Sequence, residues 1–248
     1  MSGAMTETTV LTWNVHGSHG VAVDDVAEII RRVEPDVVAL QEVQRRQVAR
    51  LAATLSMSST RWAFKHWPFS KRPEGLAVLS PHRLVRAERF RLRRAWFWSW
   101  KRRVGIDATI DTGGRLVRVL DVHLTSHDDA EQRVREAATL VARAAARQTA
   151  PIIVGDLNDG PDLSAPAELT RAGWVDAWAA VHDPDDIGAT NWTPGERTGR
   201  PPTQRLDYVF APPGAVVRSC AVAVGPADLD RAAGLSDHLP VAATVQLA

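Results

Sequence analysis

Residues able to do chemistry gather in this sequence where short apolar runs end. Residues 151–154 form one such run, and Gly155, Asp156, Leu157 and Asn158 follow it directly. The run predicts a fully buried strand, and residues two apart at its end share a face. A carboxylate and a carboxamide placed together suit a hard cation and a phosphate oxygen, because one supplies negative charge and the other a neutral donor and acceptor.

Five further clusters share this design, in which an apolar strand or a turn ends in polar side chains. They are residues 11–14 with Asn14, 37–42 with Gln41 and Glu42, 119–124 with Asp121 and His123, 205–209 with Arg205 and Asp207, and 235–240 with Asp237 and His238. Each cluster alone is an ordinary strand exit. A carboxylate beside a buried strand must, however, be paired or bound to metal. Together the clusters indicate one shared site.

The composition predicts a globular chain. Of 248 residues, 45% are hydrophobic and 24% charged, enough for a substantial core. A net charge of +1 does not indicate a nucleic-acid or membrane partner. The single Cys220 excludes an intramolecular disulfide and a cysteine-rich zinc site, so we expect a reducing, cytoplasmic location. No signal peptide or apolar run long enough for stable membrane insertion is expected.

The elements that must position these residues are strands mixed with helices. Strands are expected over residues 10–13, 36–40, 75–79, 104–110, 115–124, 206–211, 216–224 and 239–245, with a long helix over 128–147. A hairpin and a run of late strands favour an α/β fold with mixed sheets. Because no linker separates two cores, we predict a single domain over 1–248, with residues 1–8 as a loose tail.

The motifs resemble those of the endonuclease/exonuclease/phosphatase superfamily, which has the deoxyribonuclease I-like fold. The resemblance extends from Thr12 to Val245; Gly-Asp-Leu-Asn at 155–158 and Ser-Asp-His at 236–238 are its most specific signatures, followed by Leu-Gln-Glu at 40–42. It implies a four-layer sandwich of two mixed β-sheets flanked by helices. It also implies phosphoester hydrolysis with a divalent metal, usually Mg²⁺, with Mn²⁺ as the other candidate.

The resemblance assigns roles to the oxygen-bearing side chains. Glu42 is the expected principal metal ligand, with Asn14 and Asp237 assisting. Oxygen ligands of this kind match Mg²⁺. Asp156 and Asn158 are expected to orient the attacking water and to hold the phosphate.

Two histidines complete the expected site. His238 resembles the family histidine beside the scissile phosphate, and Asp207 resembles the acid that fixes its tautomer. His123 resembles the second active-site histidine. Glu74 stands where some members pair a glutamate with that histidine, although a solvated Glu at a strand start is an equal alternative. Water is expected to attack in line, with either Asp156 or His238 accepting its proton.

The substrate is less constrained than the reaction. Arg205 and Asn191 are further candidates for substrate binding, although a salt bridge explains Arg205 equally well. The His123-Leu124 pair resembles deoxyribonuclease I, sphingomyelinase and deadenylase branches and disfavours an abasic-site endonuclease. We expect a nucleic-acid phosphodiester; lipid headgroups or inositol phosphates are the alternative, and a catalytically silent binding module is the remote one.

Residues 89–103 carry seven Lys/Arg and no acid, with alternating Trp96, Trp98 and Trp100. Three explanations stay open for this segment. The Trp side chains could cover the sheet, stack on nucleic-acid bases or insert at a lipid interface.

Overall fold

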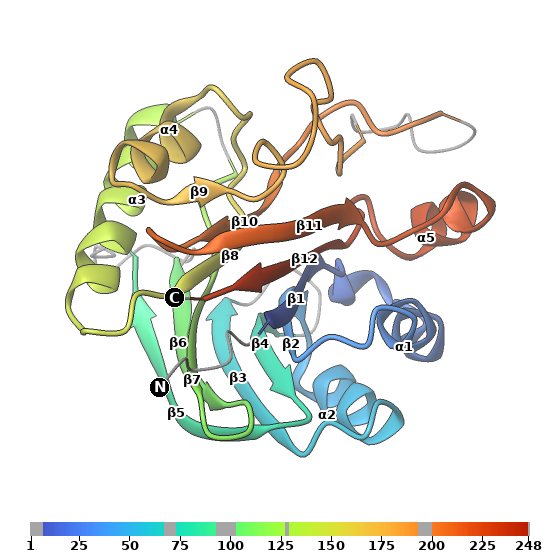
Figure 1. Cartoon of the computed structure of the whole chain (residues 1–248). Coiled ribbons are helices and arrows are strands. Elements are labelled where there is room, and N and C mark those ends of the chain that lie inside the picture. The colour runs from blue at the N-terminus through green and yellow to red at the C-terminus, as the bar shows by residue number, and fades with distance from the viewer. Residues whose placement is uncertain (1–6, 67–72, 93–102, 127–128, 193–199, 248) are drawn as a thin grey trace.

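Two six-stranded β-sheets pack face to face at the centre of the computed structural model, which describes residues 7–66, 73–92, 103–126, 129–192 and 200–247 (Figure 1). The first sheet has the order β11-β12-β1-β2-β4-β3. Its strands are β1 (Glu7–Asn14), β2 (Val37–Val43), β3 (Ser59–His66), β4 (Glu74–Ser80), β11 (Val216–Val222) and β12 (Val241–Gln246). The second sheet has the order β5-β6-β7-β8-β10-β9. Its strands are β5 (Arg83–Arg91), β6 (Val104–Asp111), β7 (Leu116–His123), β8 (Ile152–Asp156), β9 (Val175–Asp176) and β10 (Asp207–Ala211).

Helices cover the outer face of each sheet (Figure 1). The first sheet carries α1 (Val23–Arg31), α2 (Arg45–Thr54) and α5 (Leu229–Leu235), and the second carries α3 (Ala130–Ala145) and α4 (Ser164–Arg171). Short 3₁₀ turns lie at η1 (Gly17–His19) and η2 (Pro226–Asp228). Three apolar clusters fill the three spaces between the four layers. The predicted four-layer sandwich of two mixed sheets is therefore confirmed.

The apolar runs form strands that are buried on both faces. Along β1, Val10 packs between the sheets and Leu11 packs under the helices; Ala39 and Leu40 alternate in the same way along β2. This period of two lets one continuous apolar run fill two different layers.

Two parallel strand pairs bring the polar strand ends together. β1 runs parallel to β2, with Asn14 beside Gln41, and β7 runs parallel to β8, with His123 beside Asp156. Parallel strands end at the same edge of a sheet, so the polar residues that follow them collect there.

Gly155 is required where β8 lies against β7. Its φ is +136°, and a Cβ at this position would lie 2.0 Å from the carbonyl oxygen of Val122. Any larger residue would force the two strands apart. The glycine therefore allows the approach that sets Asp156 beside His123.

Two expectations about individual segments are affected. The loose tail predicted for residues 1–8 is wrong at Glu7 and Thr8, because both belong to β1 and pair with β12. Residues 93–102 lie outside the described part of the chain, so the explanations offered for Trp96, Trp98 and Trp100 stay open.

None of the described helices is both long and apolar enough to cross a membrane.

Candidate active site

Polar side chains from both sheets meet where β1, β2, β7 and β8 end. Asn14 Nδ2 donates a hydrogen bond of 3.0 Å to Asp156 Oδ2. His123 Nε2 lies 3.5 Å from the same oxygen, and its Nδ1 lies 3.8 Å from Glu42 Oε1. Asp156 thus links the ends of strands from the two sheets into one buried cluster.

A β-bulge aims Glu42 away from the regular sheet. The pairing of β2 with β4 shifts register between Leu40 and Val43, and Glu42 has a left-handed φ of 54°. Bulges of this kind redirect a side chain at the rim of a sheet. The irregularity near the end of β2 therefore turns the Glu42 carboxylate towards the site.

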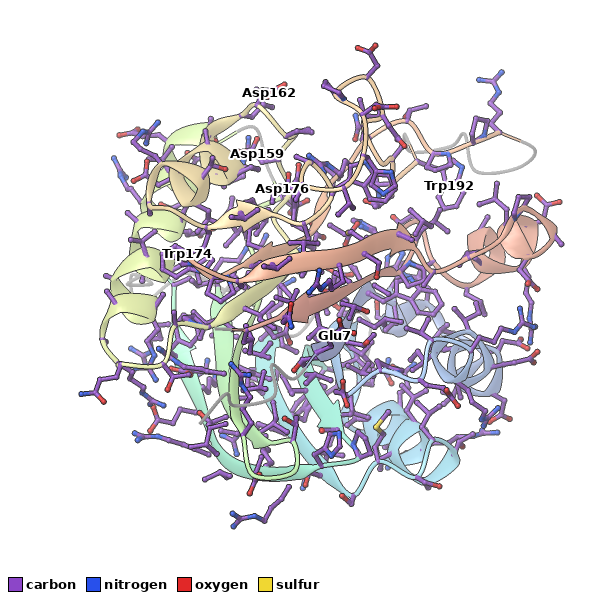
Figure 2. All side chains as sticks on the ribbon, viewed as in Figure 1. Glu7, Asp159, Asp162, Trp174, Asp176 and Trp192 are labelled. Carbon is purple, nitrogen blue, oxygen red and sulfur yellow. The ribbon has the colours of Figure 1, made fainter. Side chains whose placement is uncertain are left out.

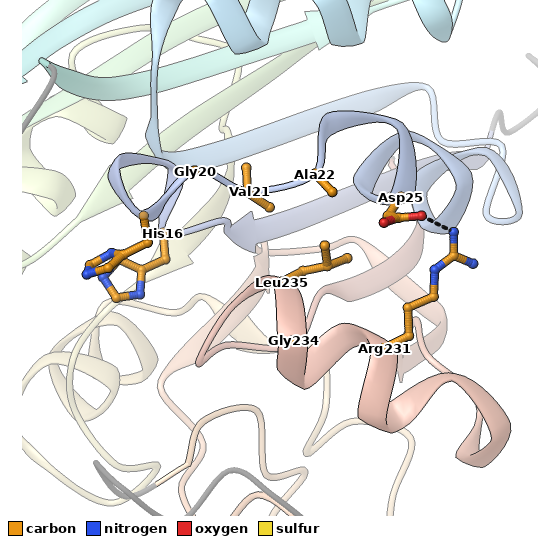
Figure 3. A pocket seen from close by; sticks show the side chains of 9 residues that line it. His16, Gly20, Val21, Ala22, Asp25, Arg231, Gly234 and Leu235 are labelled. Atoms are coloured by element: carbon orange, nitrogen blue, oxygen red, sulfur yellow. Dashed lines mark hydrogen bonds and ion pairs between the residues drawn. The ribbon is translucent and has the colours of Figure 1, made fainter.

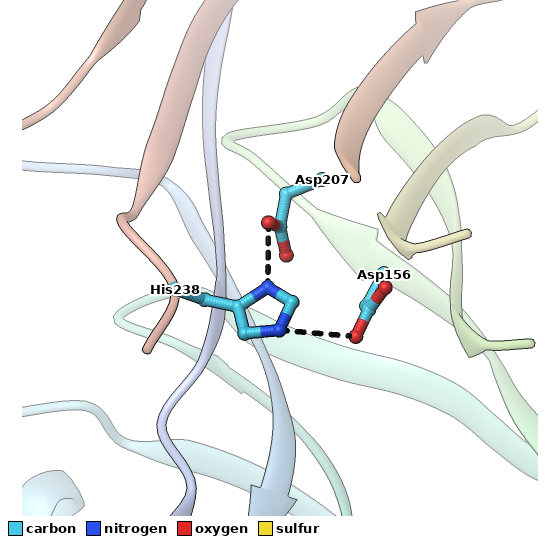
Figure 4. Close-up of side chains that lie close together, drawn as sticks. All are labelled: Asp156, Asp207 and His238. Carbon is cyan, nitrogen blue, oxygen red and sulfur yellow. Dashed lines mark hydrogen bonds and ion pairs between the residues drawn. The ribbon is translucent and has the colours of Figure 1, made fainter. Parts of the chain in front are cut away.

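His238 lies between two carboxylates (Figure 4). Its Nδ1 is 2.8 Å from Asp207 Oδ2, and its Nε2 is 3.7 Å from Asp156 Oδ2. Thr190 Oγ1 also donates to Asp207 Oδ2, at 2.7 Å. Burial alone would lower the pKa of His238, but the charges of Asp207 and Asp156 overcome it and raise the pKa to about 10. The imidazole is therefore held in its charged form at neutral pH.

Burial has the opposite consequence for Asp156. It raises the pKa of this carboxyl to about 6, although the charge on His238 and the hydrogen bond from Asn14 act to lower it. The Asn158 backbone amide donates to Asp156 Oδ1 at 2.9 Å. A carboxyl group whose pKa lies near neutrality can exchange a proton at physiological pH.

The donor set fits a hard divalent cation. Asp156, Asp207 and His238 place ligand atoms within 4.8 Å of one another, but the hydrogen bond between Asp207 and the charged His238 already uses two of these groups. Glu42 and Asp237 add carboxylates whose side chains are 21% and 36% exposed, and Asp237 Oδ1 lies 3.0 Å from His16 Nδ1. Oxygen donors at a partly open position match a cation such as Mg²⁺, which retains several waters.

The two open carboxylates are held ionised. Burial raises the pKa of Glu42, but the positive charges of Lys65, His16 and His238 outweigh it, so the pKa is lowered. The pKa of Asp237 is lowered far below its usual range, because its hydrogen bond with His16 and the charge on His238 outweigh burial. Both groups are therefore in the form that binds metal.

Lys65 is a component of the site that the sequence analysis missed. Its side chain is fully buried on β3, with Nζ 2.8 Å from His123 Nδ1 and 3.4 Å from Glu42 Oε1. Burial lowers the pKa of Lys65 to about 8, against the opposing charge of Glu42. Ala63, two residues earlier, is also buried, but the pairing of β3 with β4 shifts register between Phe64 and His66, so simple alternation along β3 does not place Lys65.

Glu74 is buried at the start of β4 rather than solvated, the alternative that we had considered for it. Its Oε1 accepts a hydrogen bond of 3.2 Å from the Ser18 backbone amide, and its expected pairing with His123 stays a prediction. Burial raises the pKa of Glu74, and the charge of Glu42 adds to this effect. Its carboxyl is thus part of the buried polar cluster and is tied to the loop that follows β1.

Arg205 forms the salt bridge that was the alternative to substrate binding. Its guanidinium lies 2.8 Å from the carboxylate of Asp176 on β9 (Figure 2) and 4.9 Å from the centre of the Tyr208 ring. The side chain is only 5% exposed. This arrangement does not support a contact between Arg205 and substrate.

The two candidate asparagines hold backbone segments of the site. Asn158 Nδ2 donates to the Leu124 carbonyl at 3.2 Å, and Asn191 Nδ2 donates to the Asp237 carbonyl at 2.9 Å. Asn191 also forms an isolated β-bridge with His238. Both side chains are therefore already engaged with the main chain beside catalytic candidates.

Asp121 is buried between the sheets rather than facing solvent. Its Oδ1 accepts a hydrogen bond of 2.7 Å from Gln41 Nε2, and its Oδ2 has no hydrogen-bond partner among the described residues. Burial raises the pKa of Asp121 well above its usual value. Burial thus favours the protonated form of this carboxyl, which joins β7 to β2.

Comparisons with known proteins agree with this arrangement. The sequence model of the Endonuclease/Exonuclease/phosphatase family matches residues 11–238. The chain belongs to this family. A search of the curated proteins finds no significant match. Members of the family hydrolyse phosphoester bonds, which accounts for the gathering of carboxylates and imidazoles at one edge.

Solved structures share the fold over almost the whole chain. An endonuclease/exonuclease/phosphatase from Beutenbergia cavernae is 26% identical, with a TM-score of 0.80 over 97% of this chain and 72% of that one. Danio rerio TDP2 complexed with single-strand DNA product is 17% identical, with a TM-score of 0.74 over 98% of this chain and 100% of that one. The human Nocturnin catalytic domain with bound sulfate is 19% identical, with a TM-score of 0.74 over 96% of this chain and 94% of that one. At the identities of the latter two, the likeness concerns the fold alone.

Proposed function

We propose that this protein is a Mg²⁺-dependent phosphodiesterase that cleaves nucleic-acid phosphodiester bonds by in-line attack of water. The observation that carries the proposal is the position of Asp156, whose Oδ2 lies within 3.7 Å of side-chain atoms of Asn14, His123 and His238. A buried acid surrounded by these groups is suited to hold a water and to accept its proton.

Glu42, Asn14 and Asp237 would hold the cation. Its chemistry, when bound, is to neutralise charge on the phosphoryl oxygens and on the leaving oxygen. Mn²⁺ would satisfy the same oxygen donors. The proposal requires these three residues to be the ones whose removal changes the metal concentration needed for half-maximal activity.

His238, with Asp207 and Thr190 behind it, would donate a hydrogen bond to a phosphoryl oxygen. Its charged ring makes it a strong donor, and Asp207 fixes the ring orientation through Nδ1. Asp156 is the better candidate for the base, because the raised pKa of His238 leaves its imidazole protonated at neutral pH.

Lys65 would act with His123 on the opposite side of the phosphate. Its ammonium is covalently attached to the chain, so this positive charge stays in the site, whereas a bound metal ion can leave. The ammonium also holds His123 through Nδ1. Preorganised charges in a buried site stabilise the negative charge that develops in the transition state. Asn158 would help to place the phosphate from the adjoining turn.

The preference for nucleic acid has one supporting comparison, since the TDP2 structure contains a single-strand DNA product. Lipid headgroups and inositol phosphates present the same reactive group and are the competing substrates.

A buried free Cys220 supports a reducing compartment, and on this basis we propose a cytoplasmic location for the protein.

A substrate panel tests this proposal. Plasmid DNA, single-stranded DNA and RNA, an abasic oligonucleotide, sphingomyelin and inositol phosphates are offered to the full chain with Mg²⁺, and again with excess chelator. We expect hydrolysis of a nucleic acid that stops with chelator and returns when Mg²⁺ is restored. Activity confined to sphingomyelin or inositol phosphates would overturn the substrate, and chelator-resistant hydrolysis would overturn the metal.

A further inference from the structure

A groove beside the candidate active site runs between the start of α1 and the end of α5 (Figure 3). Its volume is about 440 Å³, and His16, Val21 and Leu235 are among its lining residues. His16 joins the groove to the site, because its Nδ1 lies 3.0 Å from Asp237 Oδ1 and its backbone amide donates to Asn14 Oδ1 at 3.2 Å. One end of the groove thus begins at two of the proposed metal ligands.

The lining changes in character along the groove. His16 and His19 form the inner end, with ring centroids 3.6 Å apart and planes at 65°. Leu235 lies in the apolar middle (Figure 3). At the outer end, Arg231 forms an ion pair with Asp25. An occupant of the whole groove would therefore need a polar end at the site, a body that packs on apolar surface and a polar outer edge.

We propose that this groove is the subsite for the nucleoside attached to the scissile phosphate, an inference that rests on the proposed phosphodiesterase function. With the phosphate at the metal ligands, the sugar passes His16 and the base lies on the apolar middle. The hydrogen-bonding edge of the base then reaches Asp25 and Arg231. The groove volume lies within the range of about 300–1,000 Å³ that is usual for small-molecule sites.

The charges at the outer end favour a single nucleoside over the other occupants. The Arg231 guanidinium is already bonded to Asp25 and also lies 2.9 Å from Glu28 Oε2. Glu28 is itself also paired with Arg32. The charge of Arg231 is therefore already offset by carboxylates and offers little attraction to a second phosphate. A lipid tail in the groove would cover the Arg231–Asp25 ion pair and remove its water, and this desolvation is unfavourable. The groove thus fits one nucleoside without a further phosphate.

Gly234 offers a way to fill the groove without disturbing the fold. It lines the groove and is exposed, and a Cβ at this position would meet no atom within 4 Å. Gly225 is exposed in the same way and its Cβ would also meet nothing within 4 Å, but it is not among the lining residues. Gly234→Trp therefore blocks the groove, and Gly225→Trp is a matched control.

The experiment compares two nucleotides with methyl phosphate, which carries the phosphate without a nucleoside. Binding of thymidine 5′-monophosphate, thymidine 3′-monophosphate and methyl phosphate is measured by calorimetric titration in Mg²⁺ with the wild-type full chain and both variants. In the wild type and in Gly225→Trp, at least one nucleotide should bind about tenfold or more tightly than methyl phosphate, the gain expected from burying one face of a base on apolar surface. In Gly234→Trp this preference should disappear, while the affinity for methyl phosphate stays within about twofold.

Equal affinity for nucleotides and methyl phosphate in the wild type would overturn the groove as a nucleoside subsite. A nucleotide preference that survives in Gly234→Trp would overturn it as well. Both results are separate from the proposed function, which is judged by Mg²⁺-dependent hydrolysis of a phosphodiester by the wild type. Absence of that hydrolysis would overturn the phosphodiesterase proposal and the subsite with it.

Discussion

Asp156 and Lys65 show how much a single residue depends on its neighbours here. Burial raises the pKa of Asp156 to about 6 and lowers that of Lys65 to about 8. Both shifts bring the pKa of the group closer to 7, where a side chain can exchange protons or offer charge without strong hydration. Asp156 was recognisable from its motif, whereas Lys65 carries no motif. Its place follows from the register of β3 on β4, which the sequence of β3 alone does not reveal.

Lys65→Met tests whether the buried ammonium takes part in the reaction. The substitution keeps the length of the side chain and removes its charge beside Glu42 and His123. We expect kcat/KM for a phosphodiester to fall by about 10²- to 10³-fold, the usual loss when one preorganised donor is removed. Steady-state kinetics with Mg²⁺ over a range of concentrations measures it.

The thermal unfolding midpoint of Lys65→Met separates a catalytic effect from a loss of structure. A variant that melts near the wild type but turns over slowly supports the role of Lys65. Activity within about threefold of the wild type would show that the ammonium is a structural group only.

At the scale of secondary structure, four strand ends carry most of the site. Asn14, Glu42, His123 and Asp156 could be predicted because each follows an apolar run and matches a motif of the family. The parallel pairing that brings their strand ends to one edge is a finding of the structure. Thr190 could not be predicted in this way. It lies outside regular strands and reaches Asp207 only through the tertiary fold, as its bond of 2.7 Å shows. The sequence left substrate binding and a salt bridge open for Arg205, because its partner Asp176 lies 29 residues away in the chain.

Asp121 links the two sheets and should make stability depend on pH. Burial raises its pKa in the folded protein well above the 3.8 of the free side chain. Its contribution to the free energy of unfolding is therefore complete below that value and is lost as the pH rises through the folded pKa. Relative to Asp121→Asn, the wild type should lose up to about 1.4 kcal/mol per pH unit within this window.

Urea unfolding from about pH 5 to 8 measures this difference for the wild type and Asp121→Asn. Asp162→Asn, at an exposed position, serves as the control with the same change of group. A free-energy difference between wild type and Asp121→Asn that stays constant across the range would contradict the buried, neutral carboxyl.

At the scale of the whole molecule, the fold was predictable and the substrate was not. The order of motifs along the chain implied two mixed sheets, and the family match over residues 11–238 agrees with it. Bond cleavage depends on a few buried groups with strict geometry, and these groups are recognisable in the sequence as motifs. Recognition of the rest of the substrate depends on loops and grooves, such as the one between α1 and α5, and their residues form no recognisable motif.

The central claim is that Asp156 serves metal-dependent cleavage of a phosphodiester. Hydrolysis of a chromogenic phosphodiester by the wild type and by Asp156→Asn, with Mg²⁺ at pH 7, tests it most directly. We predict that the variant keeps the wild-type unfolding midpoint to within a few degrees and loses about 10³-fold or more in kcat, because a base and a water-positioning group are removed together. Turnover by Asp156→Asn close to that of the wild type would contradict this account.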